Sequence, residues 1–317
     1  MKAVFLDYAT LGPGLDPAPL RQQLPDLEIY DNTSDAEFAE RIAGAEFVFA
    51  NKFRFTPEVL EKAGELRFIG LAATGVDNVD LDGAKKNGVA VCNIRAYCTQ
   101  SIVEHVFGTL LMLTHSLHRY NDAVRAGEWQ RAEEFCMLTH PIRELSAMKL
   151  GIVGYGALGS GVARTAEWFG MDVLVSQRPG FETTDHMRMP FEKVLEQADV
   201  LSLHCPLTEQ TRGLIGEKEL KRMKSSAFLV NTARGALIDA EALVAALETG
   251  EIAGAALDVL EKEPPVDGNP LLDYKGDNLI ITPHIAWGTT EARQNALEEM
   301  AKNVKAFLDG EERNRVV

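Results

Sequence analysis

A glycine-rich turn between an apolar run and a helical pattern constrains this chain more than any other feature. The apolar residues 150–153 lead into a G-x-G-x-x-G motif, and apolar residues at helical intervals follow it. In such a turn the first glycine allows the tight bend, the second lets backbone approach a pyrophosphate, and the third lets helix and strand pack closely. The pattern predicts a dinucleotide site at a helix N-terminus, against the alternative of a turn that is merely compact. The residues of the motif are Gly154, Tyr155, Gly156, Ala157, Leu158 and Gly159.

Short apolar runs alternate with helical patterns on both sides of this motif. Such alternation is typical of parallel βαβ units, and the sequence therefore predicts an α/β fold of two doubly wound parallel-sheet domains with a cleft between them. One is a Rossmann dinucleotide-binding domain, residues 98–285. The other is discontinuous, residues 1–97 and 286–317, because a last helical pattern at 290–308 follows the completed second sheet. A single long helical segment, residues 101–125, is expected to link the two domains.

Charge and cysteine content exclude several classes of protein. The 317 residues contain 32 basic and 47 acidic side chains, a net charge of −15, and no basic cluster of the kind that binds nucleic acid. The four cysteines have no CxxC spacing, which indicates a reducing cytoplasm and no metal ligation. The longest apolar stretch, residues 106–113, is too short to cross a bilayer. We expect a cytoplasmic protein without metal, nucleic-acid or membrane partner.

The strand after the glycine motif ends without the acidic residue that usually binds the ribose of NAD. Gln177 takes its place, and Arg178 follows. A carboxylate would repel a 2′-phosphate, whereas a guanidinium attracts one. The sequence therefore favours NADPH over NADH; if Arg178 points to solvent, both cofactors bind.

Three further motifs follow predicted strands of the second domain. They bring Arg234, Glu263 and His284 to the sheet edge where α/β proteins bind ligands. Arginine offers a two-pronged donor for a carboxylate, and histidine titrates near neutral pH. A glutamate that accepts a hydrogen bond from one ring nitrogen favours the protonated imidazole. A lone arginine at a strand end is more often solvated or salt-bridged, and a lone glutamate before two prolines is more often a surface residue, but together with the glycine motif the three residues fit the reduction of a 2-oxo acid.

These motifs resemble the D-isomer-specific 2-hydroxyacid dehydrogenase family over nearly the whole chain. The resemblance is carried by the glycine motif, Asn231-Thr232-Ala233-Arg234-Gly235, Leu257-Asp258-Val259 with Glu263-Pro264, and Pro283-His284-Ile285-Ala286. It implies Arg234, Glu263 and His284 as catalytic residues and residues 74–76 as a loop whose backbone binds the substrate carboxylate. The implied substrate-binding residues are Lys52, Phe53, Thr74, Gly75, Val76, Arg234, His284 and Trp287; the further implied cofactor-binding residues are Cys205, Pro206, Thr211, Thr232, Ala233, Asp258 and Ala286.

The resemblance also implies an activity and an assembly. We expect an NAD(P)H-dependent oxidoreductase that interconverts a small 2-oxo acid and its D-2-hydroxy acid. Trp287 after His284-Ile285-Ala286 resembles glycerate dehydrogenases and hydroxypyruvate reductases, so hydroxypyruvate or glyoxylate is the favoured substrate. The alternatives are a lactate-type or phosphoglycerate-type dehydrogenase, or a dinucleotide-sensing, corepressor-like binding protein. In family members the long helix and the region after it pack around a second subunit, so the resemblance implies a homodimer.

Overall fold

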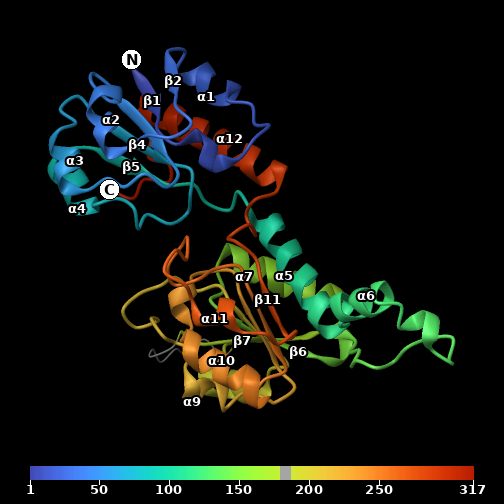
Figure 1. The fold of residues 1–317 in the computed structure, drawn as a ribbon. Helices are drawn as coiled ribbons and strands as arrows, with labels where there is room; N and C mark the ends of the chain where they lie inside the picture. The colour runs from blue at the N-terminus through green and yellow to red at the C-terminus, as the bar shows by residue number, and fades with distance from the viewer. Residues whose placement is uncertain (179–186) are drawn as a thin grey trace. The chain divides into compact units, whose positions relative to one another are not determined.

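The computed structural model describes residues 1–178 and 187–317, and the chain divides into two compact units. Unit 1 contains residues 1–98 and 287–317, and unit 2 contains residues 99–286. The sequence expectation placed these boundaries at 97/98 and 285/286. Each unit is built on one fully parallel sheet with helices packed against it, so the predicted α/β class with two doubly wound sheets is confirmed (Figure 1).

Unit 1 has a five-stranded sheet in the order β2-β1-β3-β4-β5. Its strands are β1 (Ala3–Phe5), β2 (Leu27–Ile29), β3 (Phe47–Ala50), β4 (Phe68–Leu71) and β5 (Ala90–Cys92). Its helices are α1 (Ala18–Gln23), α2 (Asp35–Arg41), α3 (Pro57–Glu61), α4 (Leu81–Lys86) and α12 (Thr290–Leu308).

Both faces of this sheet are buried, and successive residues of a strand serve opposite faces. Phe47 and Phe49 pack with α1 and α12, whereas Val48 and Ala50 pack with α2, α3 and α4. The last helix thus belongs to the first sheet, and its red ribbon lies beside the blue strands in Figure 1. All four of these strand residues are fully buried, which explains why the strand is a continuous apolar run.

Unit 2 has a six-stranded sheet in the order β11-β10-β9-β8-β6-β7. The strand order reverses between β6 and β8, and ligands of open α/β sheets bind at the carboxyl ends of the strands at such a switch point. Its strands are β6 (Lys149–Val153), β7 (Asp172–Val175), β8 (Val200–Leu203), β9 (Phe228–Asn231), β10 (Gly254–Leu257) and β11 (Leu279–Ile281). Its helices are α5 (Thr99–Thr114), α6 (Leu117–Arg125), α7 (Ala157–Trp168), α8 (Phe191–Gln197), α9 (Glu217–Leu220), α10 (Ala240–Thr249) and α11 (Pro270–Asp273).

The long helix predicted over residues 101–125 is wrong as a single element. It is two helices, α5 and α6, separated at Ser116, whose φ of 51° is left-handed. The Ser116 hydroxyl donates a hydrogen bond of 3.0 Å to the carbonyl oxygen of Pro141, and the amide of Arg143 donates one of 2.9 Å to Thr114. A distant segment therefore stabilises the bend. No helix within the described ranges combines the length and apolar character that a membrane crossing requires.

Asp199 joins three strands at the amino-terminal edge of the second sheet. Its carboxylate accepts the amide of Lys149 at 2.9 Å and lies 3.1 Å from the ammonium of Lys224. Burial by itself raises the pKa of Asp199, but these two donors together with Arg143 outweigh it, so the pKa lies below the ordinary value of 3.8. Because the ionised form is favoured in the folded state, its stabilisation is present above the unfolded pKa and lost as pH falls through the folded one.

We therefore expect Asp199→Asn to lower the free energy of unfolding at pH 7 by about 2 kcal/mol, the size of a charged hydrogen bond. Urea denaturation measures this loss, and the difference from the unmodified protein should stay constant from pH 7 down to about pH 4 and shrink below it, as the pH falls through the folded pKa. A difference that keeps its full size well below pH 4 would contradict the assignment.

Candidate active site

The glycine loop occupies the turn between β6 and α7. Gly154 has a φ of 96°, and a Cβ on it would lie 2.5 Å from the backbone nitrogen of Cys205. A Cβ on Gly159 would lie 2.0 Å from the carbonyl oxygen of Gly154. At Gly156, by contrast, a Cβ would meet no heavy atom of the described residues within 4 Å. Packing within the protein thus requires the first and third glycines, while the second faces open space at the N-terminus of α7.

Two buried polar atoms near the switch point have no hydrogen-bond partner within the described residues. They are Nδ1 of His204, which follows β8, and Oγ1 of Thr232, which follows the adjacent β9. Burial lowers the pKa of His204 to about 4, so its imidazole is neutral at pH 7. A buried polar atom without a partner is costly, and a bound dinucleotide would supply one. Sequence reasoning missed His204, although its position between a strand end and Cys205-Pro206 was a signal.

The expected cofactor-binding residues after β8 stabilise their own loop. The Thr211 hydroxyl donates a hydrogen bond of 2.8 Å to the carbonyl oxygen of Pro206, and the amide of Thr208 donates one of 2.8 Å to the Thr211 hydroxyl. Cys205 and Thr211 are both buried. Their side chains therefore fix the shape of a loop at the switch point.

Residues 176–178, the described residues that follow β7, include no carboxylate. The hydroxyl of Ser176 donates to the carbonyl oxygen of Gln177, and the amide of Gln177 donates to Met189 at 2.8 Å. Gln177 is half-buried and Arg178 is exposed. The position that carries an acid in NAD-type sites thus carries an amide and a guanidinium, and the next residues, 179–186, lie outside the described ranges.

Arg234 lies in a turn that Asn231 stabilises at the end of β9. The fully buried Asn231 side chain accepts from the amide of Ala233 at 3.0 Å and donates to the carbonyl oxygen of Arg234 at 2.9 Å. Gly235 follows, and a Cβ there would lie 1.9 Å from the carbonyl carbon of Leu260. The turn that holds Arg234 therefore packs directly against the loop that leads to Glu263.

Glu263 and His284 form a close pair from the loops after β10 and β11. Nδ1 of His284 lies 2.6 Å from one carboxylate oxygen of Glu263, and the other oxygen accepts the amide of Leu260 at 2.8 Å. A carboxylate accepts hydrogen bonds, so Nδ1 carries the proton in this pair. His284 itself has a left-handed φ of 57°, and its side chain is 29% exposed.

Asp258, one of the expected cofactor-binding residues, anchors the loop that carries His284. Its carboxylate, 1% exposed, accepts the amides of Ile285 and Ala286 at 2.8 Å each and the hydroxyl of Thr282 at 2.6 Å. Its backbone carbonyl accepts the amide of His284 at 2.8 Å. Ala286, another expected cofactor residue, is thus held by its own backbone.

The expected substrate residues of unit 1 lie in two ordered loops. Thr74 is fixed by a hydrogen bond of 2.9 Å from its hydroxyl to the carbonyl oxygen of Ile94, and the structure gives the amides of Gly75 and Val76 no acceptor within the described residues. In the other loop the buried carboxylate of Asp7 accepts the amides of Lys52 at 2.6 Å and Phe53 at 2.8 Å.

Two aromatic residues of the predicted substrate site pack against the interior of unit 1. Phe53 is 8% exposed and stacks on Phe38 with ring centroids 4.8 Å apart, so its side chain is a core residue, unlike the exposed Lys52 beside it. Trp287 is half-buried and packs on the sheet face that α12 covers.

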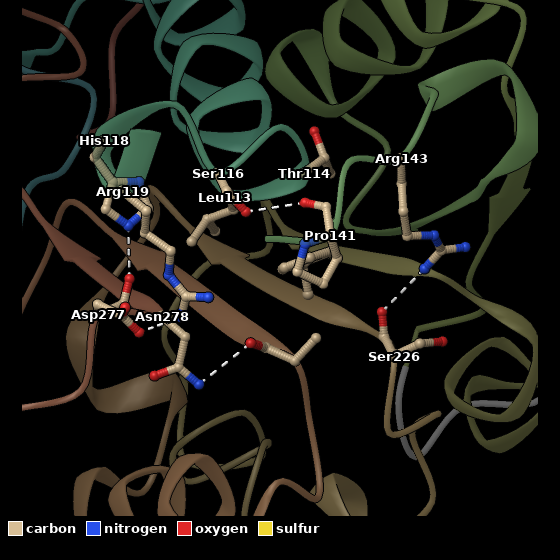
Figure 2. Close-up of a pocket in the computed structure, with 12 residues that line it drawn as sticks. Leu113, Thr114, Ser116, His118, Arg119, Pro141, Arg143, Ser226, Asp277 and Asn278 are labelled. Atoms are coloured by element: carbon tan, nitrogen blue, oxygen red, sulfur yellow. Dashed lines mark hydrogen bonds and ion pairs between the residues drawn. The ribbon is translucent and has the colours of Figure 1, made fainter. Parts of the chain in front are cut away.

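A cavity of about 210 Å³ lies elsewhere in unit 2, and none of the predicted site residues lines it (Figure 2). Its walls include Phe228, Ala253 and Asn278, which lie at the amino-terminal ends of β9, β10 and β11. Figure 2 shows Arg119 directed at Asp277 and Arg143 at the carbonyl oxygen of Ser226. Its arginines thus already have partners, and the cavity is at the opposite strand ends from Arg234, Glu263 and His284.

Known proteins resemble this chain over its full length. Residues 107–286 match the model of the D-isomer specific 2-hydroxyacid dehydrogenase NAD binding domain. The chain is 41% identical to a glycerate dehydrogenase of Methylorubrum extorquens, covering 99% of this chain and 98% of that protein. It is 37% identical to a hydroxypyruvate reductase of Blautia hydrogenotrophica, covering 98% of each. Among solved structures, a D-lactate dehydrogenase from Aquifex aeolicus complexed with NAD and lactic acid matches with a TM-score of 0.81 and 32% identity, over 97% of this chain and 96% of that one.

Substitutions of Gly156 and Gly159 distinguish a glycine needed for ligand binding from one needed for folding. Gly156→Ala places its methyl group in open space, so we expect an unchanged melting temperature without ligand but a loss of dinucleotide affinity of tenfold or more. Gly159→Ala forces backbone apart and should lower the melting temperature as well. Thermal unfolding and a dinucleotide titration by fluorescence distinguish the two; equal affinities of Gly156→Ala and the unmodified protein would contradict the role of Gly156.

Proposed function

The chain belongs to the D-isomer specific 2-hydroxyacid dehydrogenase family, whose members are oxidoreductases with an NAD(P)-binding domain, and on this premise we propose that it reduces hydroxypyruvate or glyoxylate to the corresponding D-2-hydroxy acid or glycolate. The observation that carries the proposal is the 2.6 Å contact between Nδ1 of His284 and Glu263. The names of the M. extorquens and B. hydrogenotrophica relatives support the choice of substrate.

His284 is the proposed proton donor. With Nδ1 bonded to Glu263, the protonated imidazole presents its second proton at Nε2, and the carboxylate stabilises the positive charge. A reduced nicotinamide dinucleotide, held at the glycine loop, would supply the hydride for the 2-carbon. His284 gives its Nε2 proton to the carbonyl oxygen, so one hydride and one proton convert the 2-oxo acid into the hydroxy acid. In the reverse direction the neutral Nε2 accepts the hydroxyl proton.

Arg234 and the loop at residues 74–76 are the proposed anchors of the substrate. Arg234 offers a planar pair of donors suited to a carboxylate and a carbonyl oxygen. The amides of Gly75 and Val76 are further donors for the carboxylate, and the bond from Thr74 to Ile94 keeps their loop in place. Lys52 is the side chain of the neighbouring loop proposed to contact the substrate's far end, since Phe53 is buried in the core.

We propose NADPH as the preferred cofactor. Gly154–Gly159 would hold the pyrophosphate, and Thr232, Ala233 and Asp258 would border the remaining part of the cofactor. The absence of a carboxylate from residues 175–178, together with the exposed Arg178, favours a 2′-phosphate over a 2′-hydroxyl.

A steady-state screen with hydroxypyruvate, glyoxylate, pyruvate, phosphohydroxypyruvate and longer 2-oxo acids, each with NADH and NADPH, tests the function. We expect the highest kcat/KM for hydroxypyruvate or glyoxylate with NADPH. Tight dinucleotide binding without turnover of any acid would instead favour the dinucleotide-sensing alternative, and a preference for pyruvate or the phosphorylated acid would favour a lactate-type or phosphoglycerate-type dehydrogenase.

Glu263→Gln should lower kcat about 100-fold, the usual contribution of acid–base catalysis, without weakening dinucleotide binding.

In the same screen the variant Arg178→Gln tests whether Arg178 is the reason for the preference for NADPH over NADH. It should raise KM for NADPH about tenfold and leave KM for NADH within twofold, because only the phosphate loses a charged partner. The matched control is Arg164→Gln, which removes the same charge from an exposed position on α7. A lower KM for NADH than for NADPH in the unmodified protein would refute the preference.

We further propose a homodimer formed through the segment at residues 117–142. Its exposed apolar side chains are Leu117, Val124, Trp129, Phe135, Leu138 and Ile142, with Phe135 88% and Leu138 77% exposed. Apolar groups gathered on one short segment indicate a surface that a second subunit covers.

Light scattering at micromolar concentration should give the dimer mass, and the double substitution Phe135→Ser with Leu138→Ser should shift it toward the monomer. Val266→Ser, at another apolar residue that is 75% exposed, is the control and should leave the dimer intact. A monomeric mass for the unmodified protein would refute the proposal.

The cytoplasm is the proposed location, because all four cysteines are free thiols, as is usual in a reducing compartment. Recovery of the protein outside the cytoplasmic fraction of its cells would contradict this.

A further inference from the structure

The loop that carries His284 is held from helix α5 at both of its ends. The hydroxyl of Ser101 donates a hydrogen bond of 2.6 Å to the carbonyl oxygen of Ala286, and Nε2 of His105 lies 3.0 Å from the hydroxyl of Thr282. Ser101 and His105 are four residues apart on α5, so they share one face of the helix. His284 lies between the two points of contact in the sequence.

The direction of each hydrogen bond follows from the number of protons available. The hydroxyl of Thr282 has one proton, and it donates that proton to the carboxylate of Asp258 at 2.6 Å. Thr282 can therefore only accept from His105, which requires a proton on Nε2 of that imidazole. The chain runs from His105 through Thr282 to Asp258, whose carboxylate also takes the amides of Ile285 and Ala286.

We propose that His105 and Thr282 are positioning residues for His284, an inference that rests on the proposed function. The hydroxyl of Thr282 and the amide of Ile285 share one oxygen of Asp258, while the amide of Ala286 bonds to the other. This pattern fixes the rotation of the buried carboxylate. The carboxylate in turn fixes the amides on the C-terminal side of His284, whose left-handed φ needs support from its neighbours.

The hydrogen bonds from His105 through Thr282 to Asp258 affect the orientation of Nε2 of His284 and not the binding of the dinucleotide. His105 has a side chain only 16% exposed, and its Nε2 is 3.7 Å from the carboxylate that Thr282 bonds. Loss of the Thr282 hydroxyl removes one of three hydrogen-bond donors to that carboxylate, so the carboxylate and the backbone of residues 284–286 that it binds are held less firmly. Proton transfer then slows, while the glycine loop after β6 is unchanged.

The first test observes the protons directly and does not depend on turnover. In ¹⁵N imidazole spectra of the unmodified protein, His105 should carry a proton on Nε2, and Thr282→Val should change its tautomer equilibrium. Thr282→Ser, which keeps the hydroxyl, should retain the Nε2–H form. A proton on Nδ1 alone in the unmodified protein would overturn the proposed chain whatever the activity.

The second test uses kinetics with hydroxypyruvate and NADPH. We expect Thr282→Val to lower kcat tenfold or more, with the dinucleotide Kd changed less than twofold and an increased solvent isotope effect; Thr282→Ser should recover kcat to within threefold. His105→Leu should lower kcat about fivefold and add little to Thr282→Val, because residues of one network are not additive. The inference is overturned if both single variants keep full kcat, or if Thr282→Val and Thr282→Ser lower kcat equally. If the unmodified protein turns over no acid of the screen, the proposed function is overturned instead.

Discussion

Buried carboxylates that are saturated with backbone amides hold the functional loops of this protein. A carboxylate removed from water must receive hydrogen bonds to stay ionised, and amides at a loop start are the nearest donors. Asp258 collects the amides of Ile285 and Ala286, and in unit 1 Asp7 collects those of Asn51, Lys52 and Phe53. In both places an aspartate at the end of one strand stabilises the loop that follows another. In each case the position of the aspartate at its strand end determines where the neighbouring loop lies.

The same logic explains how the three proposed catalytic residues come to one edge of the sheet. Parallel strands deliver all their carboxyl ends to one edge of a sheet, so Arg234, Glu263 and His284 need only the right side chain after the right strand. Their precise placement then comes from groups that do not react. Asn231 shapes the turn of Arg234, the amide of Leu260 fixes Glu263, and Asp258 fixes the loop of His284.

Local patterns in the sequence were sufficient for the elements and for the glycine motif, because strand periodicity, helix periodicity and the G-x-G-x-x-G spacing are contained in short windows. The bend at Ser116 was missed because its stabilising partners, Pro141 and Arg143, are about 25 residues away. The core packing of Phe53 against Phe38 and the saturation of Asp258 are equally non-local. His204 follows a strand end, which was a signal, but its lack of a partner, like the contact of His105 with Thr282, appears only when strand ends and helix faces are assembled.

The return of α12 to the first sheet sets the order in which the chain can be completed during synthesis. Ala296, Leu297, Met300 and Val304 are at most 1% exposed and cover one face of the unit 1 strands. All of unit 2 leaves the ribosome before these residues do. The first sheet is therefore completed only after unit 2 has been synthesised, and one of its apolar faces stays uncovered by α12 until residues 290–308 have emerged.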